Sequence, residues 1–568
     1  MKLSDIKTLF INLDQKIQLI IIGFIVGVVS GAASLLLNFS LEFLSELIEE
    51  NIKTNFIFVF PIMGLILSVF FLKTIFKDNR GHGVPEVIYS VRAEGGKLRL
   101  RSSISHLLAS LFTISFGGSA GPEAPVVISG ASIGSNISNF FQANERLRIS
   151  TAASGAAGAI AAIFNAPIAG IIFSLEVILG EWSILSMLPV AISSITATVI
   201  SRLFNGNQIP FKHRGIIVNI NDIFASAFFS VFIVFFALIF VKSLKIYPNL
   251  LSKYIKKAYL KAIIGGSIVS LIVFYLPQVK GEGYNLIREI ISKNYHNSFY
   301  LILLILLLKI LATSVTLGSG GAGGVFAPSL VIGSLTGLLF YSLLTYIFPQ
   351  TSFYGASLFA LVGMSGMLSA TLHSPLTGIF LIVEITGGYD VIIPLIIVSF
   401  LSSVFIKYFE KDSLYLIELS RKGYTFLPRS DERILYNIRV NEIIEKDLVY
   451  VKRNDNLDSI ALKISNSRRN IYPVVENNKY YGLLNLNDIK ALLLNSDIRK
   501  TIFVEEVMRT DYPVVSLDDN LLDVLNIFDN TGYWSLPVVE NGKFMGLVSK
   551  ATILDLYRKE LKAQTDIF

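Results

Sequence analysis

The sequence predicts an all-α polytopic membrane protein that carries a small α/β domain at its C-terminal end. Of its 568 residues, 52% are hydrophobic and 16% are charged, and the mean hydropathy is +0.61. A soluble protein of this length is far less apolar. The apolar runs stop after Tyr415, and from about Val440 the pattern is that of a soluble α/β protein.

Long apolar runs follow one another between Ile17 and Ile406. The most apolar ones cover residues 17–37, 56–72, 224–241, 301–317 and 394–406. Several approach the roughly 20 residues that an α-helix needs to cross a bilayer. Other runs are broken by Gly or Pro, at Gly121, Pro167, Gly324 and Pro375. Interrupted helices are tolerated in a membrane only where they are buried in protein or line an aqueous cavity.

The rest of the composition excludes several classes of protein. The formal charge of +7 lies in short loops without a basic stripe, which indicates charge near a membrane surface rather than a nucleic-acid partner. The chain has no cysteine, so disulfides and thiolate metal sites are excluded. We expect neither an enzyme nor a metal site, because no phosphate loop, nucleophile elbow or metal-ligand histidine spacing is present; the histidines considered are His106, His213, His296 and His373. The N-terminal segment, which contains acidic residues, is not expected to be a signal peptide.

The membrane part contains an internal repeat. The segment 165–177 resembles 373–385, with a constant offset of 208 residues. GSAGPEAP resembles GAGGVFAP at an offset of 203, and RGHGVPEVI resembles KGEGYNLI at an offset of 200. The three pairs keep their order, which predicts two homologous halves. Matching interrupted segments in two halves indicate a shared site near the membrane midplane.

The motif from Gly118 to Pro125 reads as a helix start inside the membrane. Proline is tolerated in the first turn of a helix, because that N–H has no partner there. The free N–H groups and the dipole then favour an anion. A charge near the bilayer centre costs about 2.5–3.5 kcal/mol or more, whereas one helix end returns only about 0.3–2 kcal/mol. Binding of a dehydrated anion therefore needs the second helix start, around Val325–Pro328, in an oppositely oriented half.

Glu123 lies at the first of these helix starts. One interpretation is that its carboxylate competes with a mobile anion for one position, blocking the path when deprotonated and swinging away when protonated. The other interpretation is that the carboxylate only neutralises the dipole of its own helix. The residues alone leave both open.

Taken together, GSAGPEAP, GGVFAP, GHGVPEV, NAPIAGIIFSLEV and the closing SLYLIEL resemble the CLC family of chloride channels and chloride/proton exchangers. The resemblance runs from about Gln18 to Lys422. It implies a homodimer in the lipid bilayer, with one pore in each subunit and two inverted halves of broken or re-entrant helices. By resemblance, Glu123 is the gating glutamate. The residues implied to surround the anion are His82, Gly83, Gly121, Pro122, Val325, Phe326 and Tyr415.

His82 departs from the family pattern. Members that transport chloride usually have Ser at this position. An imidazole N–H can donate to an anion as a hydroxyl does, or the side chain can turn away and leave the backbone N–H to bind. The preference for chloride over nitrate or another halide therefore stays open.

Val177 is the second departure, because exchangers typically carry a proton-transferring glutamate at this position. An apolar side chain cannot relay a proton, so the sequence favours a gated channel. A chloride/proton exchanger is the alternative, since some exchangers also lack this carboxylate. Glu181 is a candidate substitute acceptor, although a surface charge at a helix end is the simpler interpretation.

Glu176 and Glu384 occupy matching positions in the two halves. Carboxylates inside a membrane are functional by default, but one in each half favours a structural role, accepting bonds from the free N–H groups of interrupted helices. Lys309 is either a buried charge with a carboxylate partner or a snorkelling interfacial lysine.

The C-terminal part is a second duplication. Residues 456–494 align with 520–557 at a constant offset of 64 residues. Each copy reads as an amphipathic helix, a short strand, a turn at Asn-Asn or Asn-Gly, a second strand and a final helix. This part resembles a pair of CBS modules, named after cystathionine-β-synthase.

CBS pairs often bind adenine nucleotides, with a Ser/Thr-x-x-Asp element on the ribose. Neither element is complete here, so the candidate residues for ATP, ADP or AMP are Asp488, Ser549 and Thr552. A pair without ligand that stabilises a dimer is the alternative. No cofactor is required by either interpretation.

The predicted boundaries are 1–425 for the membrane domain, with halves of about 17–210 and 215–422, then a linker over 426–439 and modules over 440–497 and 498–563. We expect a prokaryotic plasma (inner) membrane with the CBS modules in the cytosol, consistent with the basic loop Arg92–Arg101. A membrane-anchored nucleotide sensor without ion flux is a further alternative.

Overall fold

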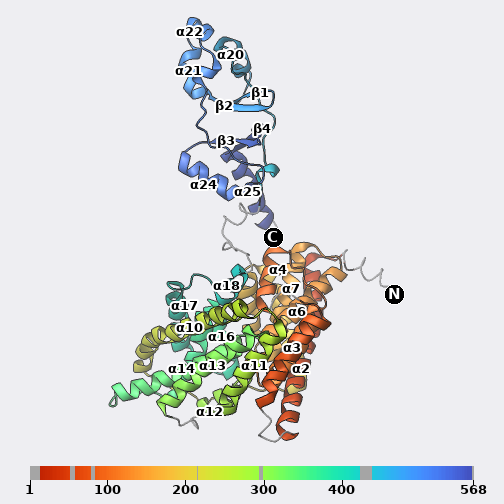
Figure 1. Cartoon of the computed structure of the whole chain (residues 1–568), viewed down its shortest axis with the longest axis vertical. Coiled ribbons are helices and arrows are strands. Elements are labelled where there is room, and N and C mark those ends of the chain that lie inside the picture. The colour runs from red at the N-terminus through yellow and green to blue at the C-terminus, as the bar shows by residue number, and fades with distance from the viewer. Residues whose placement is uncertain are drawn as a thin grey trace. The chain divides into compact units, whose positions relative to one another are not determined.

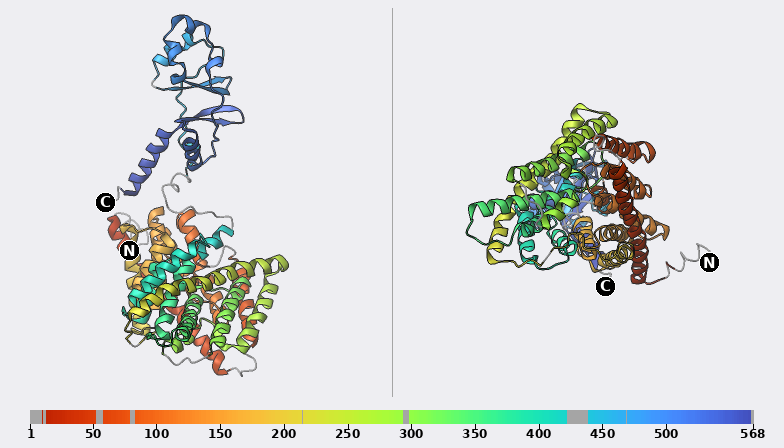
Figure 2. Two further views of the ribbon diagram at one scale, coloured as in Figure 1. Left: turned by 90° about the vertical axis from the view of Figure 1, so that its left-hand side faces the viewer. Right: turned by 90° about the horizontal axis from the view of Figure 1, so that it is seen from below.

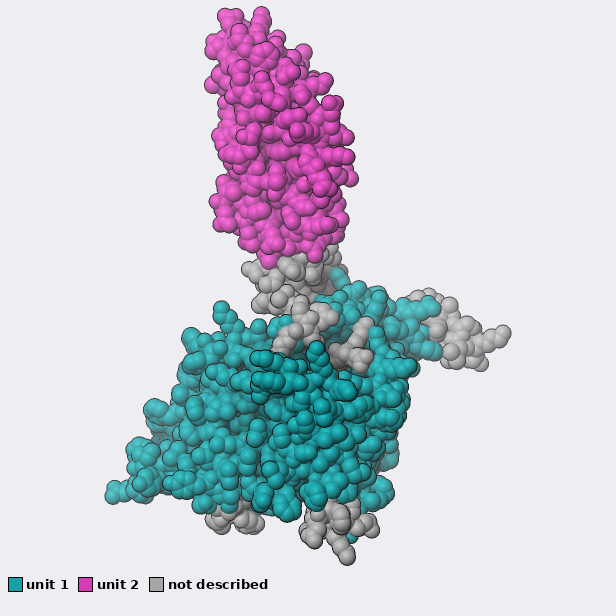
Figure 3. All heavy atoms as spheres, in the orientation of Figure 1, with its two compact units in different colours: residues 1–425 teal, residues 426–568 magenta. Residues whose placement is uncertain are grey.

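The computed structural model describes residues 10, 13–51, 58–78, 83–213, 215–292, 298–421, 438–467 and 469–565. The chain divides into two compact units, residues 1–425 and 426–568 (Figure 3). His82, His296 and most of the predicted linker lie outside the described residues.

The first half of unit 1 is built of helices, with no strand among its described residues. Its elements are α2 (Gln15–Asn51), α3 (Phe60–Phe70), η2 (Phe71–Ile75), α4 (Val84–Ala93), α5 (Ser102–Ser115), α6 (Glu123–Phe140), α7 (Glu145–Phe164), α8 (Pro167–Phe173), η3 (Ser174–Leu179) and α9 (Ile184–Asn205). The segments η2 and η3 are π-helical.

The second half repeats this order. Its elements are α10 (Ile220–Tyr254), α11 (Ala258–Tyr275), the 3₁₀ turn η4 (Pro277–Val279), α12 (Tyr284–Ile291), α13 (Phe299–Gly318), α14 (Phe326–Ile347), α15 (Ala356–Leu372), α16 (Pro375–Thr386), α17 (Ile392–Lys407) and α18 (Leu414–Arg421). The two halves lie side by side in unit 1 (Figures 1 and 2). The predicted interruptions at Pro167 and Pro375 are helix starts, because α8 and α16 begin there.

Seven helices within the described residues are long and apolar enough to cross a membrane, namely α2, α7, α9, α10, α11, α13 and α14. Shorter apolar helices of 10–17 residues lie among them. The mixture of complete and partial spans confirms the predicted polytopic fold with broken helices.

In each half, two central helices pack against each other through glycines. A side-chain carbon added at Gly130 on α6 would lie 2.1 Å from the Gly155 carbonyl oxygen on α7. In the second half, a carbon added at Gly333 on α14 would lie 2.3 Å from the Gly363 oxygen on α15. Small residues let helix backbones approach this closely, as is common in membranes. The duplication therefore extends to the packing of the core.

Unit 2 is the predicted α/β region. Its helices are η5 (Val440–Glu442), α20 (Leu457–Ser465), α21 (Leu486–Leu493), α22 (Ser496–Thr501), α23 (Val504–Val507), α24 (Leu521–Thr531) and α25 (Lys550–Thr565). Its strands are β1 (Ile471–Glu476), β2 (Lys479–Asn485), β3 (Ser535–Glu540) and β4 (Lys543–Ser549), which form one antiparallel sheet in the order β1-β2-β4-β3.

The two hairpins of this sheet are near copies. Asn477, Asn478 and Asn541 have φ between 49° and 64°, as tight hairpin turns require. The register shifts between Val474 and Val475 in one hairpin and at the corresponding place in the other. The predicted helix–strand–turn–strand–helix order of each module is confirmed.

Candidate functional site

The starts of α6 and α14 meet in the middle of unit 1. The Gly121 N–H donates to the Gly324 carbonyl oxygen at 2.9 Å, and the Gly324 N–H donates to the Gly121 oxygen at 2.7 Å. This isolated bridge is antiparallel. The first residues of the two helices, Glu123 and Phe326, follow the bridge at once. The amino ends from the two halves therefore converge at one place.

Glu123 lies over this bridge and is 1% exposed. Its Oε1 accepts a hydrogen bond of 2.7 Å from the hydroxyl of Tyr284. Its Oε2 faces the glycines, since a carbon added at Gly121 would lie 1.9 Å from it and one added at Gly324 would lie 3.2 Å away. The carboxylate thus occupies the position to which both helix ends point, where a negative group is favoured.

Two cavities approach this carboxylate. The Tyr284 cavity, of about 950 Å³, is lined by Pro122, Gly283 and Tyr284 among others. The Tyr415 cavity, of about 630 Å³, is lined by Ala124, Val325 and Tyr415 among others. The two linings share no described residue, and Glu123 belongs to neither. Glu123 therefore lies at the separation between two cavities in an apolar unit.

Two of the other predicted anion ligands, Val325 and Tyr415, belong to the Tyr415 cavity. Val325, the residue before α14, and Tyr415, on α18, both line it. Phe326 is 2% exposed, and its ring packs against Phe164 and Phe173. Gly83 precedes α4 and lies against Ala124, because a carbon added to it would come within 2.7 Å of the Ala124 Cβ.

Val177 lies in the π-helical η3 and is 7% exposed. Neither Val177 nor Glu181 lines the Tyr284 or the Tyr415 cavity. The carboxylates that line the Tyr415 cavity among the described residues are Asp78 and Glu418.

Glu176 and Glu384 cap each other's half. Glu176 accepts bonds from the N–H groups of Leu376 and Thr377 at 3.2 and 2.8 Å, at the start of α16. Glu384 accepts bonds from Ile168 and Ala169 at 3.0 and 2.7 Å, at the start of α8. The predicted structural role of both carboxylates is confirmed, because these N–H groups have no partner within their own helices.

Lys309 is fully buried, which excludes the snorkelling interpretation, but its hydrogen bonds go to backbone carbonyls and not to the carboxylate that the other interpretation expects. Its Nζ donates to the carbonyl oxygens of Val279 and Gly281 at 2.9 and 2.8 Å, in the loop before α12. It aligns with His106 in the first half, 203 residues earlier. Each half thus places a basic residue against the loop before its short helix.

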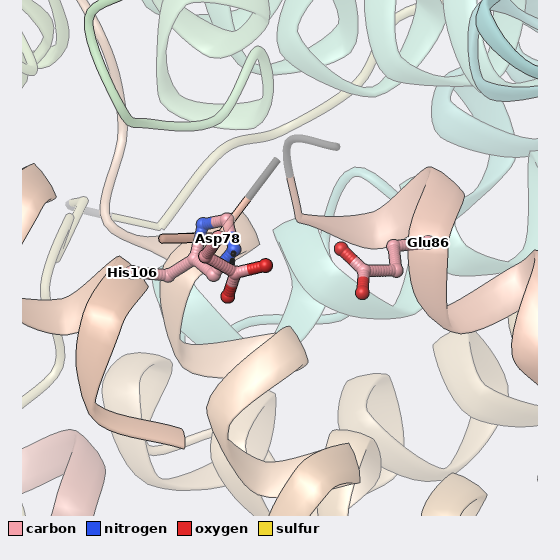
Figure 4. Close-up of side chains that lie close together, drawn as sticks. All are labelled: Asp78, Glu86 and His106. Atoms are coloured by element: carbon pink, nitrogen blue, oxygen red, sulfur yellow. Dashed lines mark ion pairs between the residues drawn. The ribbon is translucent and has the colours of Figure 1, made fainter. Parts of the chain in front are cut away.

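His106 lies in a buried cluster with Asp78 and Glu86 (Figure 4). The Asp78 Oδ2 accepts bonds of 2.9 Å from Ser102 and Ser105 and lies 3.8 Å from the His106 Nε2. One ligand atom of each of the three residues lies within 4.8 Å of the others, close enough to hold a metal ion. Sequence spacing predicts no such group, because the three residues come from a loop, α4 and α5.

Tyr284 is the contact that sequence reasoning missed. The repeat itself carried a signal, because Tyr284 follows Gly283, the residue that aligns with Gly83 of the predicted anion motif. The apolar Val84 stands at the matching position of the first half. Because one copy of the motif carries a polar ring and the other an aliphatic side chain, the two copies are expected to have different roles.

In unit 2 the nucleotide candidates fall into two groups. Ser549 and Thr552 both donate to the Glu445 carboxylate, which also accepts from Arg469. Burial raises the pKa of Glu445, but these hydrogen bonds outweigh burial and hold the pKa below its usual value.

Asp488 belongs to the second group. It pairs with Arg509 through two contacts, of 2.7 and 3.2 Å. The rings of Tyr512 and Tyr533 are stacked at 4.1 Å, and Tyr512 contacts Asn485. This group combines an acid, a guanidinium and flat aromatic faces.

Family models match both parts of the chain. The model described as voltage gated chloride channel matches residues 63–407. The CBS domain model matches residues 440–495 and 504–559.

Relatives and solved structures agree with these matches. The chain is 30% identical to the H(+)/Cl(-) exchange transporter ClcA of Vibrio cholerae over 347 residues, which is 60% of this chain and 74% of that protein. The crystal structure of a slow cyanobacterial Cl-/H+ antiporter matches with a TM-score of 0.63 at 23% identity, covering 72% of this chain and 98% of that one. A eukaryotic CLC transporter matches with a TM-score of 0.64 at 17% identity over 94% and 97% of the two chains.

Proposed function

Because this chain belongs to the voltage-gated chloride channel family, we propose that it carries chloride across a membrane past Glu123. The observation that carries the proposal is the position of Glu123, which is buried between the Tyr284 and Tyr415 cavities at the junction of two helix starts. The protein described here is then a transporter rather than an enzyme.

The geometry supports competition between the carboxylate and the anion. Backbone N–H groups and two helix dipoles stabilise one negative charge at the start of α6 and α14. In the structure the carboxylate of Glu123 occupies this place. Protonation removes its charge and its advantage over chloride, so the side chain can leave and an anion can take the position. Tyr415 and the N–H groups of Val325 and Phe326 are the proposed ligands on the Tyr415 side.

Reconstituted protein tests this proposal. Proteoliposomes loaded with chloride are expected to release it faster as the external pH falls, and Glu123→Ala is expected to remove that pH dependence. Absence of any chloride flux from the wild-type chain would contradict transport. Flux with an unchanged pH dependence in Glu123→Ala would retain transport and contradict the gating role.

Chloride/proton exchange is the coupling mode that we favour. Val177 supports a channel, because the proton-transferring carboxylate is missing there. The relative from Vibrio cholerae is named as an exchanger, and at 30% identity this supports exchange more strongly than one substituted position supports a channel. Asp78 and Glu418 line the Tyr415 cavity and are candidates for delivering the proton.

Simultaneous measurement of chloride and proton flux separates the two modes. In an exchanger, a chloride gradient drives protons uphill in liposomes without a membrane potential. In a channel, chloride moves and the proton gradient does not respond. The same liposomes test the anion preference at His82, since His82→Ser is expected to change the chloride-to-nitrate flux ratio if the imidazole faces the anion.

For unit 2 we propose adenine-nucleotide binding at the group around Asp488. A carboxylate suits the ribose hydroxyls, Arg509 suits a phosphate, and the ring of Tyr533, which stacks on the buried Tyr512, offers a face for a base. Ser549 and Thr552 are weaker candidates, because both already donate to Glu445, whose charge repels phosphate. A CBS pair without ligand, acting in dimer contacts, is the alternative.

A melting experiment on residues 440–561 tests nucleotide binding. Millimolar ATP or AMP is expected to raise the melting temperature, and Asp488→Ala is expected to remove more of that rise than Ser549→Ala. No shift with any adenine nucleotide would favour the alternative.

We further propose a homodimer in a bacterial inner membrane with unit 2 in the cytosol. The bacterial relative supports the membrane, and adenine nucleotides are available on the cytosolic side. The rival function, a nucleotide sensor anchored in the membrane, predicts no chloride flux and no effect of Glu123→Ala. Protease protection of unit 2 in intact spheroplasts tests the orientation.

A further inference from the structure

Tyr284 reaches Glu123 from the opposite half of the chain. Its hydroxyl donates a 2.7 Å bond to the Glu123 Oε1, whereas Oε2 faces Gly121 and Gly324. The ring lines the Tyr284 cavity. The two oxygens of one carboxylate are thus held by a side chain on one side and by the paired helix starts on the other.

We propose that Tyr284 is a positioning residue whose hydroxyl latches the Glu123 carboxylate in place and thereby sets the proton concentration at which the passage opens. This inference rests on the proposed role of Glu123 in chloride transport. It assigns to α12 of the second half a task that its counterpart, α4, does not have, because α4 begins with Val84.

The fold holds the Tyr284 ring rigidly enough for this task. Gly283 adopts φ of +83° just before it, a conformation that glycine accepts without strain. The ring meets Phe211 edge to face, with centroids 5.3 Å apart. Phe211 is 2% exposed, and its N–H donates to the Ile385 carbonyl oxygen at 2.9 Å. A donor that is fixed before the carboxylate arrives loses little conformational entropy when the bond forms.

Lys309 fixes the other end of the same loop. Its buried Nζ bonds the carbonyl oxygens of Val279 and Gly281, two to four residues before Gly283. A side-chain carbon added at Gly283 would lie 3.3 Å from this Nζ. The loop before α12 is thus tied to α13, so the position of Tyr284 follows the core of the second half.

Several charged and titratable groups surround the hydrogen bond between Tyr284 and Glu123. Glu282, in the same loop, interacts electrostatically with Glu123, Lys309, Arg288 and Glu42. Tyr284 also interacts electrostatically with Arg288 on its own helix, and Tyr415, on α18, interacts electrostatically with Glu123. Tyr284→Phe leaves all the other groups in place and removes one hydroxyl, which is why that substitution isolates the latch.

A hydrogen bond to a carboxylate favours its charged form. The latch therefore stabilises the deprotonated, seated Glu123 and delays its release until the pH is lower. Without the hydroxyl, Glu123 takes up a proton at a higher pH, and the passage opens at a lower proton concentration.

The test is the pH profile of chloride flux from liposomes that contain the full chain. Tyr284→Phe is expected to move the pH of half-maximal flux upward by about one unit, a tenfold change in proton concentration. The matched control is Tyr354→Phe, which also removes one hydroxyl bond in unit 1, to Gly215 at 2.9 Å. We expect the control to keep the wild-type midpoint.

A double-mutant cycle with Glu123→Ala separates the latch from a structural effect. In the Glu123→Ala background, Tyr284→Phe is expected to leave chloride flux unchanged at every pH, because no carboxylate is left for the hydroxyl to hold. An unchanged midpoint in Tyr284→Phe, with normal flux, overturns the latch and leaves the transport proposal intact. An equal effect of Tyr284→Phe with and without Glu123 also overturns it. If the wild-type chain itself shows no chloride flux, the transport proposal is refuted instead.

Discussion

The two halves of unit 1 share a frame and differ at its centre. Helix pair α6/α7 and helix pair α14/α15 meet through glycines, and Glu176 and Glu384 cap each other's halves. At the shared site, however, Glu123 of the first half stands where the second half has Phe326, and Tyr284 of the second half stands where the first has Val84. The matching glycines and carboxylates build the fold, whereas Glu123 and Tyr284, which have no like residue at the matching position of the other half, lie at the proposed anion path.

The strongest test of this comparison removes the carboxylate of Glu123. Glu123→Ala is expected to abolish closure at high pH, because no deprotonated side chain remains to exclude the anion. Flux at pH 8 should then equal flux at pH 5 in liposome assays, and uphill proton movement should disappear. The matched change at the other helix start, Phe326→Leu, removes no charge and should retain the pH dependence. Normal closure in Glu123→Ala would show that the asymmetry at this position is unrelated to gating.

The shared caps should behave alike. Glu176→Gln and Glu384→Gln each weaken two charge-assisted bonds to backbone N–H groups, so each is expected to destabilise unit 1 by about 1.5–3 kcal/mol. Thermal unfolding of purified protein in detergent measures the effect, with Glu181→Gln as the control. A large effect of one substitution and none of the other would break the comparison, because it would give the two carboxylates different roles.

The glycine contacts should also be equivalent. Gly130→Ala and Gly333→Ala place a carbon near a backbone oxygen that cannot turn away, and overpacking of this kind costs about 1–3 kcal/mol. Both variants are expected to melt earlier than the wild type by similar amounts. If one half accepts alanine freely, the packing of the two helix pairs is less alike than their backbones indicate.

The smallest expected effect concerns unit 2, whose halves also differ. The Glu445 carboxylate accepts hydrogen bonds from Ser549, Thr552 and Arg469, so the pKa of Glu445 is lower in the folded state than in the unfolded state. Its contribution to stability is therefore present above the unfolded pKa and is lost as the pH falls through the folded pKa. Melting of residues 438–565 between pH 7 and pH 3 should show a slightly shallower decline in Glu445→Gln. An identical decline in both proteins would indicate that Glu445 adds nothing.

Much of this arrangement could be predicted from the sequence, because duplicated motifs fix which segments correspond. The helix starts at Pro167 and Pro375 and the hairpin turns at Asn477 and Asn541 follow from local rules for proline and asparagine. The structural role of Glu176 and Glu384 follows from their matching positions, although the helices that they cap do not. The comparisons place the chain in the family that the motifs indicate.

Long-range side-chain contacts could not be predicted in the same way. Tyr284 and Glu123 are 161 residues apart, and nothing in either neighbourhood specifies their distance. The cluster of Asp78, Glu86 and His106 arises because a loop and two helices meet, which spacing along the chain does not show. Val177 illustrates a further limit, since one substituted side chain favoured a channel while the comparison with relatives favours exchange.

The bridge between Gly121 and Gly324 has a consequence for motion. Two hydrogen bonds tie the repeats together where α6 and α14 start, and pulling the helix starts apart would break both bonds. Rotating one side chain breaks neither. We therefore expect the main chain around the bridge to stay nearly still during a transport cycle, in contrast to carriers whose halves rock against each other.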